Sequence, residues 1–197
     1  MRSLVIIAFG WLALVSLAAC DNSSEALGSY PAVNKSDCLP EAALVDQRGN
    51  PFSPASLKGK LALVDFVYTS CTGPCPMLTA KLHDVSKKLG GEMGKSVTIL
   101  TISLDPENDT PAKLASYAKA QDADVAGWYF VTGKPAQIER VLQSFDLRRE
   151  KESDGSVTHN VASFLMGPDG HQIRQYNGLE VKAQTVVDDI ASHLPRS

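Results

Sequence analysis

Two cysteines four positions apart are the strongest chemical signal in the chain. Cys71 and Cys75 lie within the segment Tyr-Thr-Ser-Cys-Thr-Gly-Pro-Cys-Pro at residues 68–76. An apolar, β-branched run at 61–68 comes directly before it and predicts a buried strand. Apolar residues at helical spacing between 72 and 89 come directly after it. At least one thiol is therefore expected beside the free N–H groups of a helix N-terminus, where the thiolate is favoured.

Two sulfurs at this spacing can do two kinds of chemistry. On a helix, residues four apart project to the same side, so the pair can bind one soft ion such as Cu(I) or close a local disulfide. A structural disulfide, or two buried thiols, is the plainer alternative in an exported protein. A bridge between residues so close in sequence closes almost no loop and contributes little stability. The position and spacing of the pair therefore favour metal binding or thiol–disulfide exchange.

The other polar residues of interest lie far from the cysteines in sequence. His159 precedes a predicted strand at 162–166, so a loop can bring it to the pair, but the residues alone leave open a solvated loop histidine. Asp105 follows a predicted strand at 97–104, at the sheet edge where sites form. It either orients the site or is a turn residue. Asp109 and Thr110 are expected to begin a helix, and the remaining histidines need no functional role: His83, His171 and His193.

Alternating strands and helices must position these groups. Turn-forming residues at 46–51 lie between short apolar runs and predict a hairpin. Further strands are predicted at 97–104, 128–132, 162–166 and 172–176, and further helices from Thr110, over 138–145 and over 186–194. A β-α-β unit followed by a β-β-α unit is typical of a thioredoxin-like α/β fold, with a central mixed sheet flanked by helices and an N-terminal hairpin. The strand at 61–68 is expected to be the central one.

The composition of the chain indicates a globular protein and argues against several other classes. The 197 residues fit one folded domain, and 44% hydrophobic with 21% charged residues is ordinary for a globular protein. A formal net charge of −3 gives no reason to expect binding to nucleic acid. Four cysteines are too few for a disulfide-rich scaffold.

Residues 1–19 predict an export signal. Arg2 precedes an apolar run at 4–17 that is short for a spanning helix, which needs about 20 residues; an uncleaved signal anchor is the alternative. Leu-Ala-Ala-Cys at 17–20 resembles the lipobox of bacterial lipoproteins, which implies that Cys20 is lipidated. On this resemblance residues 20–37 comprise the lipid anchor and a linker, and the Asn- and Ser-rich composition after Cys20 predicts that the linker is flexible. The folded domain is then expected over 38–197.

Three segments together resemble the Sco/SenC family of copper-binding, thioredoxin-fold proteins that serve in cytochrome c oxidase assembly. They are Val-Asp-Phe-Val-Tyr-Thr-Ser-Cys-Thr-Gly-Pro-Cys-Pro at 64–76, Ser-Leu-Asp-Pro-Glu-Asn-Asp-Thr-Pro at 103–111, and the segment at 158–170 that begins Thr-His-Asn-Val. The resemblance implies that Cys71, Cys75 and His159 bind a copper ion, Cu(I) or Cu(II). Thr158 stands where the family usually has aspartate.

The resemblance implies a membrane-tethered metallochaperone rather than an enzyme. Its partners would be the copper-site subunit of cytochrome c oxidase and other periplasmic copper chaperones. Its place would be the bacterial cell envelope, on the periplasmic side of the inner membrane. The alternative is a thiol–disulfide oxidoreductase that uses Cys71 and Cys75 to keep the oxidase cysteines reduced, without metal. A peroxide-reducing or redox-sensing role is a weaker third hypothesis. Cys38 is expected to be a partly buried free thiol.

Overall fold

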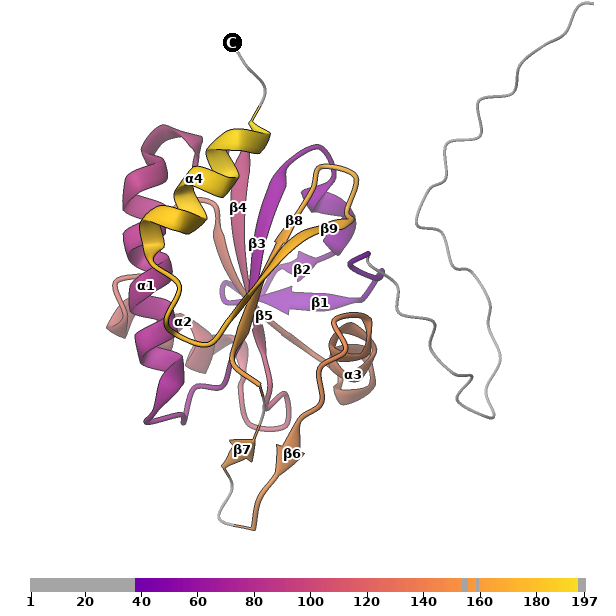
Figure 1. Cartoon of the computed structure of the whole chain (residues 1–197). Helices are drawn as coiled ribbons and strands as arrows, with labels where there is room; N and C mark the ends of the chain where they lie inside the picture. The colour runs from indigo at the N-terminus through magenta and orange to yellow at the C-terminus, as the bar shows by residue number, and fades with distance from the viewer. Residues whose placement is uncertain (1–37, 154–155, 159, 195–197) are drawn as a thin grey trace, which may run out of the picture.

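The computed structural model describes residues 38–153, 156–158 and 160–194 (Figure 1). Cys20, His159 and the predicted signal and linker at 1–37 lie outside these ranges. Within them, no helix has both the length and the apolar character needed to cross a membrane.

A seven-stranded mixed sheet forms the centre of the fold, in the order β2-β1-β5-β4-β3-β8-β9. Its strands are β1 Leu44–Asp46, β2 Pro51–Phe52, β3 Leu61–Val67, β4 Val97–Ser103, β5 Trp128–Gly133, β8 Ala162–Met166 and β9 Gln172–Asn177. β3, β4 and β5 run parallel, and the other neighbours are antiparallel. The thioredoxin-like α/β class and the N-terminal hairpin β1–β2 are confirmed.

The order of the strands corrects one expectation. β4, and not β3, takes the middle place of the sheet, while β3 lies beside it between β4 and β8. All seven residues of each of these strands are buried. Two strands covered on both faces give the same continuous apolar run, so sequence alone cannot rank them.

The described part of the chain has four α-helices, which cover the sheet: α1 Pro74–Leu89, α2 Pro111–Ala120, α3 Pro135–Ser144 and α4 Ala183–His193. Figure 1 shows α1, α2 and α4 on one face and α3 on the other. Short 3-10 turns lie at η1 Pro54–Leu57 and η2 Gly90–Glu92. α2 begins as predicted, because the Thr110 hydroxyl accepts the Lys113 N–H at 3.3 Å and Pro111 takes the first helical position.

A small hairpin was not predicted. β6 Glu150–Lys151 and β7 Val157–Thr158 pair with each other as a separate two-stranded sheet. Figure 1 shows this hairpin projecting from the end of the molecule where β3 and β4 end. Two-residue strands are too short to produce an alternating pattern, which explains why the sequence did not reveal them.

Candidate metal centre

The cysteine pair lies at the junction of β3 and α1. β3 ends at Val67, and Cys71 follows in a loop whose turn is closed by the Cys71 N–H donating to the Tyr68 carbonyl at 3.1 Å. α1 begins at Pro74, so Cys75 is its second residue. The expectation that both cysteines share one helix face is therefore wrong, because Gly73 and Pro74 start the helix after Cys71. The loop turn brings the sulfurs together instead.

Both thiols are free and buried, with 7% of Cys71 and 2% of Cys75 exposed. Burial disfavours the Cys71 thiolate, but hydrogen bonds from the Cys75 thiol and from the backbone N–H groups of Cys75 and Gly73 outweigh it and lower the pKa of Cys71. Burial, and next the hydrogen bond with Cys71, raises the pKa of Cys75. The expected thiolate at the helix N-terminus is thus Cys71, with Cys75 as its hydrogen-bond donor.

Asp109 holds the cysteine loop in place. Its carboxylate accepts the Thr69 N–H at 3.2 Å, the Thr69 hydroxyl at 2.5 Å and the Ser103 hydroxyl at 2.6 Å, and only 2% of the residue is exposed. The expectation that Asp109 serves to begin α2 is therefore wrong, since Thr110 alone caps the helix. Thr69 is forty positions away in sequence, so no local pattern could reveal this contact.

Asp105 lies in the same loop between β4 and α2. Its carboxylate accepts hydrogen bonds from Lys151 Nζ at 2.9 Å and from Asn108 Nδ2 at 2.7 Å, and 2% of the residue is exposed. Its backbone carbonyl also closes a turn with the N–H of Asn108. Asp105 is thus both a turn residue and a contact to the β6–β7 hairpin.

Asp65 is a buried acid that sequence reasoning missed. It lies in β3 opposite Thr101 of β4, and none of it is exposed. The Trp128 indole N–H donates to the Thr101 hydroxyl at 2.9 Å, which donates in turn to Asp65 Oδ1 at 2.6 Å. Asp65 Oδ2 has no hydrogen-bond partner. Burial raises the pKa of Asp65 to about 7, because the charged form is poorly solvated there.

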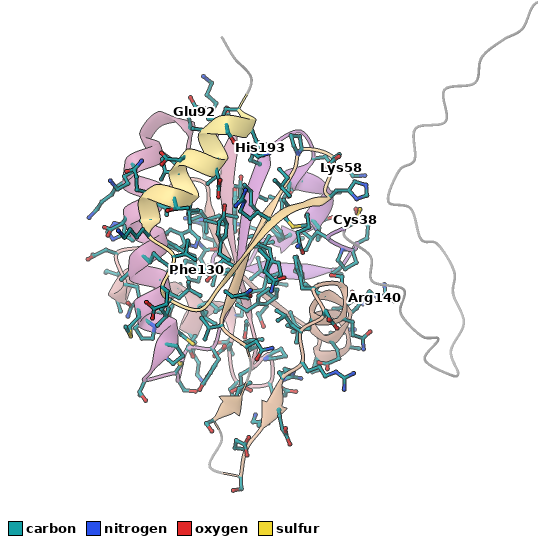
Figure 2. The ribbon with its side chains drawn as sticks, viewed as in Figure 1. Cys38, Lys58, Glu92, Phe130, Arg140 and His193 are labelled. Carbon is teal, nitrogen blue, oxygen red and sulfur yellow. The ribbon has the colours of Figure 1, made fainter. Side chains whose placement is uncertain are left out.

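Cys38 lies at a different place in the fold. Figure 2 shows it near Lys58, away from the β6–β7 hairpin. Its Sγ lies 3.2 Å from Nδ1 of His171, whose segment pairs with it in an isolated bridge. Cys38 is disulfide-bonded, so the expectation of a free thiol is wrong. His83 and His193 lie on α1 and α4, and within the described residues neither forms a hydrogen bond with the cysteine pair.

The donor set of the described site consists of two sulfurs. Two neighbouring thiols that can ionise fit a soft metal ion such as Cu(I). No group of three Cys, His, Asp or Glu side chains that could hold a metal occurs in the ranges the structure describes. The backbone of Val157 in β7 hydrogen-bonds the Tyr68 hydroxyl, so β7 reaches the loop that carries Cys71. Residue 159, the predicted third ligand, follows β7 by one position and lies outside the described residues.

The sequence of this chain matches the model of one known protein family. The family model described as SCO1/SenC matches residues 33–195. The SCO1 protein homolog of Bacillus subtilis is 39% identical over 150 residues, which is 75% of this chain and 76% of that protein.

Three solved structures are similar over most of the chain. ScoI of Bradyrhizobium japonicum with copper bound is 29% identical, with a TM-score of 0.70 over 80% of this chain and 99% of that one. BsSco, in which a disulfide switch is identified, is a member of the Sco family of cytochrome c oxidase assembly proteins. It is 34% identical, with a TM-score of 0.70 over 79% of this chain and 92% of that one. A SCO1/SenC family lipoprotein of Bacillus anthracis is 25% identical, with a TM-score of 0.71 over 79% and 94%.

Proposed function

Because this chain belongs to the SCO1/SenC family, we propose that it is a copper-binding metallochaperone that delivers copper to the copper site of cytochrome c oxidase. Its ligands are Cys71, Cys75 and His159. The observation that carries the proposal is the pair of free, hydrogen-bonded thiols at the end of β3. The copper-bound relative from Bradyrhizobium japonicum and the oxidase-assembly relative BsSco support it.

The two thiols have different tasks in taking up copper. Cys71 has the lower pKa and supplies the first thiolate. Cys75 is more buried and must release its proton as the metal binds, because thiols coordinate as thiolates. The His159 imidazole completes a set of three ligands and leaves a position at which a ligand from the partner can attach. Stepwise ligand exchange then moves the ion to the oxidase.

A second function is favoured by the same asymmetry. A thiol of lowered pKa beside a buried thiol of raised pKa suits an attacking and a resolving cysteine. The chain would then be a thiol–disulfide oxidoreductase that keeps the cysteines of the oxidase copper site reduced. BsSco, with its disulfide switch, supports this alternative.

His159→Ala separates the two functions. A copper carrier that loses one ligand is expected to bind copper at least about 100-fold more weakly, since loss even of a group that supports a ligand costs 10–100-fold. Oxidase assembly should fall in parallel. The Cys71–Cys75 pair should still form and exchange a disulfide, because thiolate attack needs no imidazole. Copper affinity, disulfide exchange and oxidase activity are measured on the same variant.

His83→Ala is the matched control, because it removes a histidine from α1 that is placed two helical turns beyond Cys75. It should match the wild type in all three assays. Near wild-type oxidase assembly by a stably folded His159→Ala chain would contradict the carrier function and favour the reductant.

We also propose a lipid anchor for this chain. Residues 1–19 form the signal peptide, Cys20 is the lipidated first residue of the mature protein, 20–37 is the linker, and 38–197 is the copper-binding domain. The lipobox-like Leu-Ala-Ala-Cys at 17–20 supports this division, as does the lipoprotein relative from Bacillus anthracis. The anchor would hold the domain on the periplasmic side of the inner membrane, beside the oxidase.

Cys20→Ser is expected to remove the anchor. The variant should lose metabolic labelling with palmitate and move from the membrane to the soluble fraction, because serine cannot form the lipid thioether. Because Cys71 and Cys75 are free, a disulfide of Cys38 and the lipid thioether would compete for the Cys20 sulfur. Mass spectrometry of the wild type should find lipid on Cys20, and a Cys20–Cys38 disulfide would contradict the anchor. Unchanged membrane association and labelling in the variant would favour an uncleaved signal anchor.

A further inference from the structure

The sheet face that carries α3 is only partly covered. Figure 1 shows α3 as the one described α-helix on this face, whereas α1, α2 and α4 lie on the other. The ring of Phe145, which follows α3, is centred 5.3 Å from that of Phe66 in β3 and 4.6 Å from that of Phe164 in β8. The chain that leaves α3 therefore covers β3 and β8 on this face, and β9 lies beyond them as the outermost strand.

A cavity of about 460 Å³ opens between the segment after α3 and β9. Phe145 and Val161 contribute apolar surface to it. Its polar lining consists of one carboxylate and three side-chain amides: Asp146, Asn160, Gln175 and Asn177. No basic side chain is among the described residues that line it. The cavity therefore suits a cationic group that donates several hydrogen bonds.

Alternation along β9 directs its amides to this cavity. Tyr176 donates to Asp189 of α4 at 3.0 Å, and Arg174 lies 3.3 Å from the same carboxylate, so both point to the other face. Gln175 and Asn177 point to the α3 face, since successive side chains of a strand alternate. Gln175 Nε2 donates to Asn177 Oδ1 at 2.7 Å. Within the described residues no group donates to Gln175 Oε1, so this oxygen can accept from a ligand.

Asp146 presents its carboxylate from a left-handed turn at the end of α3. Its φ is 54°, its N–H donates to the Gln143 carbonyl at 3.1 Å, and the Leu147 N–H donates to the Leu142 carbonyl at 2.9 Å. The residue is exposed, and within the described part of the chain its carboxylate forms no ion pair. A charge at a fixed position is thus available to a ligand.

The cavity lies at the cysteine end of the sheet. Val161 directly precedes β8, and Ser163 of β8 pairs with Asp65 near the end of β3. β8 and β9 are the first and second neighbours of β3 on this side. Strands of a sheet lie about 4.8 Å apart, so the end of β9 is about 10 Å from the end of β3. A protein bound at β9 therefore lies beside the loop that carries Cys71.

The outer edge of β9 has no strand neighbour among the described residues. An extended polypeptide can pair with such an edge through backbone hydrogen bonds, and its side chains then alternate between the two faces of the sheet. A side chain on the α3 face enters the cavity. Arginine matches the lining, because its guanidinium carries a positive charge for Asp146 and several donors for the amide oxygens, while its methylene stem packs on the apolar surface.

We propose that β9 and this cavity form a docking site for an extended segment of the protein that receives the copper, which pairs with β9 and inserts an arginine beside Asp146. The inference rests on the proposed copper-carrier function and deepens it by naming the surface and the chemistry of its partner. The docked segment holds the two proteins together while copper leaves the cysteines. This surface should therefore govern the affinity for the partner and not the affinity for copper.

Asp146→Asn tests the inference, because asparagine tolerates the left-handed conformation but carries no charge. The probe is the oxidase subunit that carries the copper site, purified in detergent without copper. Its dissociation constant from the reduced, metal-free chain, measured by biolayer interferometry, should rise about tenfold or more, since a hydrogen bond to a charged group is lost. The affinity of the chain for Cu(I) should match the wild type.

Two changes at Gln175 should act in opposite directions. Gln175→Lys places a cation at the cavity and should weaken binding of the subunit at least tenfold. Gln175→Glu adds a second carboxylate and should strengthen it. Gln175 is exposed, so neither change disturbs the core.

Asp122→Asn is the matched control. Asp122 is also exposed, has a φ of 53° and follows the end of a helix, α2, which lies on the other face of the sheet (Figure 1). This variant should bind the subunit as the wild type does.

Photocrosslinking identifies the docked segment. Benzoylphenylalanine at position 175 should crosslink to a segment of the subunit that contains an arginine, and at position 188 on α4 it should not. Replacement of that arginine by methionine should weaken binding to the wild type about tenfold, with no further loss in Asp146→Asn.

Equal affinity of Asp146→Asn and the wild type for the subunit would overturn the inference. A crosslinked segment without arginine, or a subunit that does not bind the wild-type chain, would also overturn it. A wild-type chain that takes up no copper would contradict the proposed function instead. The two failures are distinguishable, because binding of the subunit is measured on the metal-free chain.

Discussion

Cys71→Ser/Cys75→Ser is expected to abolish stoichiometric copper binding. Both soft donors of the described site are lost, and a serine hydroxyl is a poor ligand for Cu(I). The thiolate charge-transfer band of the Cu(II) form should disappear with them. The fold should survive, because burying a hydroxyl in place of a thiol costs about 1–3 kcal/mol. The effect is measured as the copper that the variant retains after gel filtration. Circular dichroism checks that the variant is folded.

Cys38→Ser is the control, since it removes a buried cysteine whose segment pairs with His171, beyond the end of β8, and not with the cysteine loop. It should retain one copper per chain. Tight stoichiometric binding by the double serine variant would mean that the copper site lies elsewhere in the protein.

The second large effect is the pH dependence of the stability of the fold, which the buried carboxyl of Asp65 is expected to cause. In the folded chain burial raises the pKa of this carboxyl from 3.8 to about 7, so it stays protonated up to neutral pH. The unfolded chain releases the same proton near pH 3.8. Between these values the unfolded state binds fewer protons, so this group lowers the stability of the fold as pH rises to about 7. The difference corresponds to about 4 kcal/mol once both states are ionised.

Asp65→Asn removes this dependence. Its side-chain oxygen still accepts the Thr101 hydroxyl, but the amide cannot ionise. As the pH rises from about 4 to about 8, the free energy of unfolding of the variant should therefore increase by about 4 kcal/mol relative to that of the wild type. Urea unfolding of both reduced proteins across this range measures the difference. Asp188→Asn changes an exposed carboxylate of α4 and is the control. Its free energy of unfolding should change with pH as that of the wild type does. If the free energies of unfolding of Asp65→Asn and of the wild type changed with pH in the same way, Asp65 would not be the source of the pH dependence.

Periodic patterns account for the parts of the fold that the sequence predicted. Leu78, Leu82, Val85 and Leu89 repeat at helical spacing and all are buried in α1. Thr110 and Pro111 mark the start of α2 by local chemistry. Such signals need only neighbouring residues, so one sequence suffices to read them.

The polar contacts around the site depend on residues far apart in sequence. Asp65 lies inside an apolar run and is stabilised by Thr101 on a different strand, so the run hides it. Asp109 occupies a position typical of a helix start but binds Thr69 of the cysteine loop. Arg149 donates a hydrogen bond to Glu107, which lies 42 positions away in sequence. These contacts follow from tertiary packing, which local spacing does not encode.

The copper content of the reduced wild-type chain is the most direct test of the carrier function. The reduced chain is titrated with Cu(I) under a competing chelator, and the Cu(II) form is examined for thiolate charge transfer. One copper per chain is predicted for the reduced protein, and none after the Cys71–Cys75 disulfide has formed, because the thiolates are the ligands. No tight binding by the reduced chain, or equal binding by the oxidised chain, would contradict a copper carrier that uses these two cysteines.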